Sequence, residues 1–292
     1  MRENPASPSL GAGRDGLGDE GGGARGAQVD ARDIRDQIFA GLGERTFAAS
    51  LRAMAPGVLA GVEAAERRAA GLGLRVEWAY AEGEWLPAGA EIARLVGRAK
   101  AIALGEECLL GCLGKASGIA TAARRAAELA AGRVRVVSGA WKKMPPELKE
   151  MVRRAVQVGG IPFRILDEPF LYLDKNYVRM LGGIEAALAA VRGLEGVRVV
   201  QVRGEEAPIA EETVRACRSG AGVVMVDTGR REDAVAALEA AAPYPSVRIA
   251  FAGGIRLEDI PALADLGVHI LDIGTAIVDA PLLEVQLDVL RD

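Results

Sequence analysis

The feature that most constrains the fold is a regular alternation after Gly132, where short runs rich in β-branched residues alternate with stretches of helical periodicity. Such alternation is typical of repeated β/α units around a parallel sheet. Seven runs can be counted, at residues 134–137, 162–166, 170–173, 197–202, 222–226, 247–252 and 269–273. A complete barrel of this kind needs eight strands. The sequence therefore predicts an α/β fold, namely an incomplete, seven-stranded α/β barrel that is open on one side.

The residues before this region have a different pattern. Helical stretches at 31–42 and 57–72 mix with short β-like pieces at 75–80 and 91–96. This mixture predicts an N-terminal α+β sandwich domain. Two alanine-rich helices are expected to follow it, at 102–113 and 118–131.

The chain is therefore expected to have three parts. Residues 1–26 contain eight glycines and scattered charges without an apolar segment, so they resemble a flexible tail and not a signal peptide. The predicted boundaries give a disordered glycine-rich tail at 1–30, the N-terminal α+β domain at 31–113 and the barrel domain at 114–292.

The composition argues against several classes of function. The formal net charge is only −4, so the chain has no broad electrostatic footprint for nucleic acid or an anionic membrane. No uncharged apolar run reaches about 18 residues, which argues against a membrane span. Small-molecule substrates are the expected partners.

The three cysteines form no C-x-x-C pair, which fits a reduced, cytoplasmic protein. Cys108 and Cys112 are one helical turn apart and could share a metal, although buried core thiols are the simpler interpretation.

Glycines follow the last two predicted barrel strands. Gly253 and Gly254 come after the sixth strand, and Gly274 and Thr275 come after the seventh with a short helix behind them. Glycine lets backbone N–H groups approach a phosphate, and a helix N-terminus adds about half a positive charge. Either step alone is explained as well by a tight turn, but both together match a recurrent phosphate site of α/β barrels. We therefore expect these four residues to bind phosphate.

Asp227 ends the fifth predicted strand, directly after Val-Val-Met-Val. A carboxylate at this end of a barrel strand can hold Mg²⁺ directly or through water, and so neutralise a diphosphate. The same side chain can instead cap the helix that follows. The pattern leaves both roles open, and Asp227 is the candidate metal ligand.

Basic side chains follow or occupy other predicted strands. Lys142 and Lys143 are adjacent after the first strand, where they suit a carboxylate or phosphate, although solvated surface lysines are the alternative. Arg164 lies inside a strand-like run, where an unpaired buried charge would be costly, so it is expected to meet an anion or carboxylate. Lys175, in Asp174-Lys175-Asn176-Tyr177, ends the third run, either in the site or in an internal salt bridge.

Taken in this order, these residues resemble the quinolinate phosphoribosyltransferases, also called carboxylating nicotinate-nucleotide pyrophosphorylases. Ser117-Gly118-Ile119-Ala120-Thr121 is similar to the signature helix start of the family, and Gly57-Val58-Leu59-Ala60-Gly61 is similar to part of its N-terminal domain. Downstream, Asp227, Gly253-Gly254 and Gly274 fall in register. The resemblance extends from about residue 31 to the C-terminus.

The resemblance implies a pentosyltransferase of NAD biosynthesis that joins quinolinate to phosphoribosyl diphosphate, with loss of diphosphate and carbon dioxide. It also implies Mg²⁺ on the diphosphate, and a homodimer or higher homo-oligomer in which the N-terminal domain helps to close the partner's barrel. Fixed charges around an oxocarbenium-like anomeric carbon would lower the barrier. The expected catalytic residues are Lys143, Lys175 and Asp227, and the expected acceptor-binding residues are Lys142, Lys143, Arg164, Lys175 and Glu107.

Several acceptor-site residues depart from the family pattern. Trp141-Lys142-Lys143 stands for Thr-Arg-Lys, which replaces a bidentate arginine by a point charge. Phe163-Arg164 stands for His-Arg, and the acid and base are exchanged in Asp174-Lys175. Glu107 replaces an arginine that the partner subunit would contribute, and Gln201 replaces a metal-side glutamate. Unless other groups compensate, these changes should weaken quinolinate binding by several kcal/mol.

These departures leave three hypotheses. The first is an Mg²⁺-dependent phosphoribosyltransferase that acts on quinolinate or a related pyridine acid, or on a different nitrogen heterocycle. The second is a non-catalytic nucleotide-binding protein that keeps the phosphate loops. The third is another phosphate-binding barrel enzyme, such as an isomerase or aldolase, which explains the glycines but not the N-terminal domain. The many charged residues at strand ends favour the first hypothesis.

Overall fold

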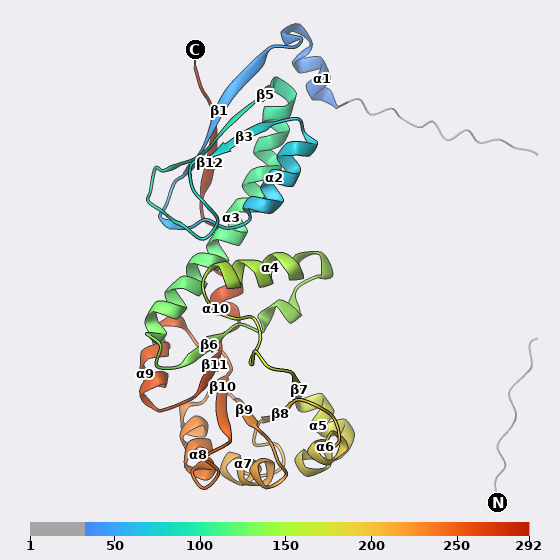
Figure 1. Cartoon of the computed structure of the whole chain (residues 1–292), viewed down its shortest axis with the longest axis vertical. Helices are drawn as coiled ribbons and strands as arrows, with labels where there is room; N and C mark the ends of the chain where they lie inside the picture. The colour runs from blue at the N-terminus through green and yellow to red at the C-terminus, as the bar shows by residue number, and fades with distance from the viewer. Residues whose placement is uncertain (1–32, 292) are drawn as a thin grey trace, which may run out of the picture.

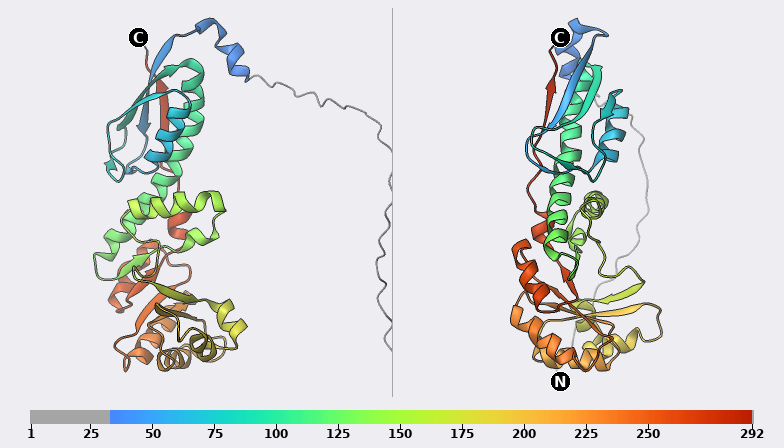
Figure 2. Two further views of the ribbon diagram at one scale, coloured as in Figure 1. Left: turned by 45° about the vertical axis from the view of Figure 1, so that its right-hand side comes forward. Right: turned by 60° about the vertical axis from the view of Figure 1, so that its left-hand side comes forward.

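The computed structural model of the chain describes residues 33–291. The tail predicted at 1–30 lies outside the described residues. The molecule is elongated, with an N-terminal lobe at one end, a barrel lobe at the other, and helix α3 (Ala99–Ala130) running between them (Figure 1). Two turned views show the same end-to-end arrangement of the lobes (Figure 2).

The N-terminal lobe is an antiparallel sheet covered by helices, which confirms the predicted α+β layer. The strand order is β12-β1-β5-β3. Leu51, Leu95 and Leu109 are fully or almost fully buried between the sheet and the helices α2 and α3. The elements before α3 are α1 (Ile34–Ile38), η1 (Ala40–Leu42), β1 (Thr46–Ala53), β2 (Gly57–Val58), α2 (Val62–Gly71), β3 (Arg75–Trp78), β4 (Trp85–Leu86) and β5 (Glu91–Arg98).

Helix α3 is continuous over 32 residues, so the two helices expected at 102–113 and 118–131 are one helix. Ser117 and Gly118 do not interrupt it because they are packing positions: the Ser117 hydroxyl accepts from Ala60 N–H at 2.9 Å, and a Cβ on Gly118 would lie 2.0 Å from the Pro281 carbonyl oxygen. The predicted domain border at 113/114 lies within this helix and remains a prediction. Despite the length of α3, no helix among the described residues is apolar and long enough to cross a membrane.

The barrel lobe contains a curled parallel sheet with strand order β6-β11-β10-β9-β8-β7. This confirms the incomplete α/β barrel, with six strands instead of seven. Its strands are β6 (Arg135–Val137), β7 (Phe170–Leu173), β8 (Val197–Val202), β9 (Val223–Asp227), β10 (Arg248–Ala252) and β11 (Ile270–Asp272).

The second predicted strand, at 162–166, does not form. Pro162 has no N–H group to donate to a ladder, although its carbonyl accepts from Ser138 N–H at 3.0 Å just beyond β6. Ile165 and Leu166 are nevertheless buried in the barrel interior. The apolar residues of this run are therefore buried in a loop, and they do not pair as a strand.

Helices pack on the outer face of the barrel sheet. Side chains alternate along a strand, so Val224 and Val226 face the helices while Val223 and Met225 face the interior. The elements are η2 (Ala140–Lys143), α4 (Pro146–Val158), α5 (Lys175–Leu181), α6 (Ile184–Ala190), α7 (Ile209–Arg218), α8 (Arg231–Ala241), η3 (Leu257–Asp259), α9 (Ile260–Asp265) and α10 (Thr275–Val278). The chain then returns to the N-terminal lobe, where β12 (Val285–Val289) pairs antiparallel with β1.

Candidate active site

Two carboxylates lie at the barrel rim, which we define as the carboxyl ends of strands β6 to β11. Asp227 ends β9 and Asp272 ends β11. They are two residues beyond the interior residues Met225 and Ile270, so by strand alternation they lie on the inner face. The barrel interior is therefore apolar between the strands and acidic at its mouth.

A cavity of about 270 Å³ opens beside Asp272. The side chains that line it are mainly aromatic and basic: Gly139, Trp141, Lys142, Arg153, Phe163, Arg164, Ile165, Phe170, Tyr172 and Asp272. The Lys142 ammonium lies 4.5 Å from the centre of the Tyr172 ring, and the Arg164 guanidinium lies 5.1 Å from the centre of the Phe170 ring. Such a combination of flat walls and cations suits a planar anionic ring.

A third cation is fixed in this cavity by the aromatic residues. The Arg153 guanidinium stacks 4.0 Å from the centre of the Trp141 ring, and it comes from helix α4. The indole N–H of Trp141 donates to the Phe163 carbonyl oxygen at 3.1 Å, which fixes the ring. Trp141, which replaces a threonine of the family pattern, thus positions a guanidinium.

The carboxyl group of Asp272 is shielded from solvent. Burial raises its pKa, and the charge of Asp227 adds to this effect, whereas a 2.8 Å hydrogen bond from Gly139 N–H and the nearby ammonium groups of Lys142 and Lys143 oppose it. A Cβ at position 139 would lie 3.0 Å from Asp272 Oδ2, so glycine there permits the close approach. Burial also raises the pKa of Tyr172, so its phenol stays neutral and can donate a hydrogen bond.

Asp227 is held by donors from the neighbouring strand and the loop after it. Its Oδ2 atom accepts from Gln201 Nε2 at 2.5 Å and from Arg203 Nη1 at 2.8 Å. The side-chain amide oxygen Oε1 of Gln201 accepts from the backbone N–H of Lys175 at 2.7 Å. A single chain of hydrogen bonds thus connects the start of α5 with the ends of β8 and β9. Asp227 does not cap the following helix, since α8 has no side-chain cap.

The glycines of the predicted phosphate site lie in two neighbouring loops, because β10 and β11 are paired. Gly253 and Gly254 have positive φ angles of 109° and 66°, which favour glycine. A Cβ on Gly253 would lie 2.4 Å from the Gly229 backbone nitrogen, so packing also requires glycine there. Both glycines and Arg231 line a cavity of about 230 Å³. Gly274 and Thr275 begin α10.

Two predicted acceptor residues, Arg164 and Glu107, have surroundings that differ from those expected. Arg164 is exposed and lies outside any strand, so the argument that burial forces it onto an anion does not hold, although it does line the cavity beside Asp272. Glu107 lies on the part of α3 in the N-terminal lobe, where it is 62% exposed and forms an ion pair with Arg35. Lys142, Lys175 and Asp227 are all at the barrel rim, as is Lys143 at the end of η2.

Sequence reasoning missed Asp272, Arg153, Arg203 and Tyr172 as site residues. Asp272 had a usable signal, because an acid inside the apolar run Ile-Leu-Asp-Ile is costly without a function or a partner. Arg153 and Arg203 had no usable sequence signal, because in the sequence they resemble ordinary surface arginines. Only the fold places Arg153 beside Trp141 and Arg203 beside Asp227.

The cysteines do not form a metal centre. Cys108 and Cys112 are partly buried and Cys217 is buried. Burial raises the pKa values of Cys112 and Cys217, which disfavours the thiolate form that metals bind. Within residues 33–291, no group of three or more His, Cys, Asp or Glu side chains is arranged to hold a metal ion.

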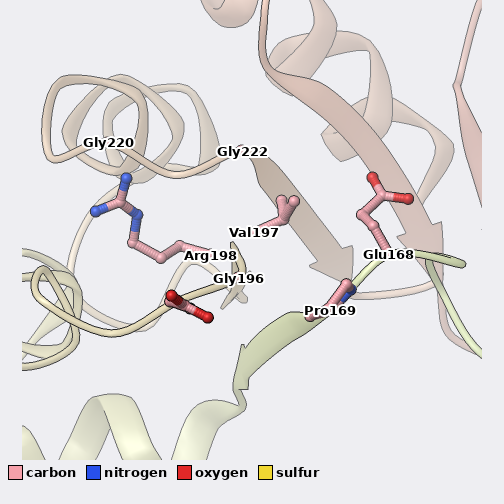
Figure 3. A pocket seen from close by; sticks show the side chains of 8 residues that line it. Glu168, Pro169, Gly196, Val197, Arg198, Gly220 and Gly222 are labelled. Atoms are coloured by element: carbon pink, nitrogen blue, oxygen red, sulfur yellow. The ribbon is translucent and has the colours of Figure 1, made fainter.

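A larger cavity, of about 550 Å³, lies at the opposite end of the strands (Figure 3). Its residues precede or begin strands β7, β8 and β9, as Glu168, Arg198 and Gly222 do. The Glu168 carboxylate pairs with Arg248 at 2.8 Å. This cavity is therefore at the amino ends of the strands and is not connected with the residues of the rim.

Comparison with known proteins assigns both lobes. The N-terminal domain of quinolinate phosphoribosyl transferase matches residues 33–117, and its C-terminal domain matches residues 119–288. The nicotinate-nucleotide pyrophosphorylase (carboxylating) of Homo sapiens is 32% identical over 82% of this chain and 81% of its own length. A probable enzyme of the same name from Methanothermobacter thermautotrophicus is 29% identical over 90% of this chain and 95% of its own.

Solved structures show the same fold. The nicotinate-nucleotide pyrophosphorylase of Francisella tularensis superimposes with a TM-score of 0.75 at 22% identity, covering 90% of this chain and 92% of that one. The structure from Pyrococcus furiosus gives a TM-score of 0.75 at 23% identity, covering 87% of this chain and 72% of that one. Because the two domain matches together span almost all described residues and a relative is 32% identical over 82% of this chain, the chain belongs to the quinolinate phosphoribosyltransferase family.

Proposed function

We propose that the chain transfers the phosphoribosyl group of phosphoribosyl diphosphate to quinolinate, giving nicotinate mononucleotide, diphosphate and carbon dioxide in NAD biosynthesis. The observation that best supports this is the acceptor-side cavity, where Lys142, Arg153 and Arg164 face aromatic walls. Quinolinate is a planar ring with two carboxylates, so it needs both stacking surfaces and cations. Membership of the family supports the same reaction.

The acceptor cavity also offers compensation for the arginine that the family pattern has at position 142. Arg153 supplies a guanidinium to the same cavity, 4.0 Å from the Trp141 ring. A guanidinium binds a carboxylate with two parallel hydrogen bonds, which an ammonium group cannot do. We assign Lys142, Arg153 and Arg164 to the acceptor carboxylates, and Lys143 to the same side of the rim. This compensation favours quinolinate over a less acidic heterocycle.

The donor side is assigned to the loops after β8 to β11. The glycine loops at Gly253-Gly254 and Gly274-Thr275 would hold the 5′-phosphate through backbone N–H groups. Lys175 would face the departing diphosphate. The ring nitrogen of the acceptor attacks the anomeric carbon while the bond to diphosphate breaks, and the fixed cations stabilise the charge that leaves. The carboxylate next to the ring nitrogen then leaves as carbon dioxide, and the ring carbon takes a proton.

Mg²⁺ is proposed only as a counter-ion of the free co-substrate, because a diphosphate attracts divalent cations in solution. The residues around Asp227 do not fit a bound metal. They present donors to its carboxylate, and no metal-ligand cluster exists within residues 33–291. No step of the reaction is assigned to a protein-held ion.

We further propose a homodimer or higher homo-oligomer in the cytoplasm. Glu107 is exposed on the N-terminal lobe, at the position where the family pattern has a residue that the partner subunit contributes to the barrel. An exposed rim and an exposed lobe of one chain can be joined by symmetry between two copies. The three free cysteines support a reducing compartment.

Steady-state turnover with quinolinate and with nicotinate, each with phosphoribosyl diphosphate, tests the proposed function. Formation of nicotinate mononucleotide should be much faster from quinolinate, because nicotinate lacks the second carboxylate that the cations of the cavity would bind. Mass spectrometry of the nucleotide product measures both rates. Turnover of nicotinate without turnover of quinolinate would refute the proposed acceptor.

A further inference from the structure

The polar groups around the Asp227 carboxylate show whether this side chain is suited to bind a metal ion. Mg²⁺ requires nearly octahedral oxygen coordination, usually with one or two carboxylates beside phosphate and water. At Asp227 the nearest polar groups are an amide N–H of Gln201 and the guanidinium of Arg203, both donating to Oδ2. A guanidinium at 2.8 Å already neutralises the carboxylate, so a second cation on the same group would be repelled.

The other carboxylates of the rim do not complete a metal site either. Asp174 accepts from the backbone N–H groups of Asn176 and Tyr177 and so caps α5. Asp272 accepts from Gly139 N–H and lies near the ammonium groups of Lys142 and Lys143. Each rim carboxylate thus has donors of the protein itself.

Arg203 is held firmly at this position by its backbone. The loop after β8 folds around the carboxylate of Glu212, which is 2% exposed. Glu212 accepts from the N–H groups of Arg203 at 3.0 Å and Gly204 at 2.8 Å, and from Glu206 at 2.9 Å and Ala207 at 3.4 Å. A buried carboxylate with four backbone donors fixes the loop and therefore the direction of the Arg203 side chain.

The guanidinium of Arg203 still has donors for a ligand. Nη1 binds Asp227 and Nε lies 3.4 Å from Glu205, whereas Nη2 has no partner among residues 33–291. Arg203 lines a cavity of about 200 Å³ together with Lys175, whose ammonium forms no ion pair with the described residues. Glu205, Glu206 and Glu212 also line it, and each of these carboxylates already has an arginine or backbone N–H partner. Arg179 lines the same cavity, but both of its bonded nitrogens are used by Glu205, at 2.9 and 2.7 Å.

We infer that Arg203, oriented by Asp227 and Gln201, is a diphosphate-binding residue that supplies a fixed cation where a carboxylate–metal site would otherwise lie. Its free Nη2 and the Lys175 ammonium bind the departing diphosphate, and Asp227 is a positioning residue for Arg203. The two N–H groups of Nη2 can donate to phosphate oxygens, and the charge of the guanidinium needs no metal. The inference rests on the proposed function for the identity of the anion.

Calorimetric titration of the full chain with inorganic diphosphate, in EDTA and then with Mg²⁺, tests this inference. The wild-type chain should bind diphosphate in EDTA, and Arg203→Met should weaken that binding by at least about tenfold, which is the usual scale for one charge-assisted contact. Arg203→Lys, which keeps the charge and guards against a folding defect, should lie between them. Arg192→Met is the matched control, because it removes an equal charge from an exposed position that does not line this cavity, and it should leave the affinity unchanged.

Titration with Mn²⁺ alone, followed by electron paramagnetic resonance, tests the metal side of the inference. The wild-type chain should not bind Mn²⁺ through Asp227, whereas the double variant Gln201→Glu with Arg203→Glu should gain a site for Mn²⁺.

Three outcomes would each overturn the inference. They are no binding of diphosphate in EDTA, equal diphosphate affinity in wild type and Arg203→Met, and wild-type Mn²⁺ binding that Asp227→Asn abolishes. Quinolinate turnover is measured separately. Its absence with intact Arg203-dependent diphosphate binding would contradict the proposed function alone.

Discussion

Lys142 lines the acceptor-side cavity, 4.5 Å from the Tyr172 ring, so its ammonium is placed to bind a carboxylate of the acceptor. Lys142→Met should raise KM for quinolinate by roughly 10-fold to 100-fold, because a hydrogen bond to a charged group contributes about 1.5–3 kcal/mol. Lys149→Met is the control, since Lys149 is on α4 and is not a lining residue. Steady-state kinetics measures both, and an unchanged KM for Lys142→Met would remove this residue from the site.

The buried acid Asp272 makes a pH-dependent contribution to stability. Its pKa is raised by burial in the folded chain, while the unfolded chain ionises near the ordinary value of 3.8. The neutral form therefore stabilises the fold fully below about pH 3.8, and this stabilisation is lost as the pH rises through the raised pKa. Asp272→Asn keeps an acceptor for Gly139 N–H but cannot ionise, so its stability relative to wild type should increase across this window. Urea unfolding at several pH values measures the difference, and a pH-independent difference would contradict the assignment.

For single residues, the sequence predicted which strand end a side chain follows better than it predicted which partners the side chain contacts. Lys142 and Asp227 lie at the rim because they follow strands that are recognisable from their β-branched residues. Glu107 could not be placed, since its expected role depends on a second chain. Arg203 could not be recognised, because only the fold brings its guanidinium within 2.8 Å of Asp227.

Among the elements, helix α3 depends on a close approach of the chain that returns from the barrel. Gly118→Ala would place a Cβ 2.0 Å from the Pro281 carbonyl oxygen, and such overpacking costs about 1–3 kcal/mol. Gly111 is on the same helix with nothing within 4 Å, so Gly111→Ala should stabilise by about 0.5–1 kcal/mol. Thermal or urea unfolding compares the two variants. Similar effects of both substitutions would show that the contact with Pro281 is not as close as described.

Element type was largely predictable from sequence periodicity in the barrel lobe, whereas strands β1 and β12 were not predicted and the helix expected at 57–72 begins only at Val62, after strand β2. Two of the other differences have physical causes. The apolar run at 162–166 has the composition of a strand, but Pro162 cannot donate to a ladder, so the run packs as a loop. The stretch around Ser117 and Gly118 looks like a helix break, yet it lies inside α3 because other segments contact it there. Local sequence shows neither that the run at 162–166 stays unpaired nor which segments contact Ser117 and Gly118.

For the whole molecule, the proposal of a homodimer or higher homo-oligomer predicts the minimum mass of the particle in solution. Sedimentation velocity should give at least twice the chain mass of 30.5 kDa. An isolated chain leaves its N-terminal lobe and barrel rim uncovered, which symmetric association would bury. A monomer that turns over quinolinate at the full rate would contradict the proposal that a partner completes the site.

The central claim is that the barrel rim transfers phosphoribosyl to quinolinate, and a single-turnover experiment tests it most directly. The enzyme in excess is mixed with phosphoribosyl diphosphate and quinolinate labelled in the carboxylate next to the ring nitrogen, then quenched at successive times. Transfer to quinolinate should give equal final amounts of nicotinate mononucleotide, diphosphate and labelled carbon dioxide. Release of diphosphate without nucleotide or carbon dioxide would show hydrolysis in place of transfer, and would contradict the central claim.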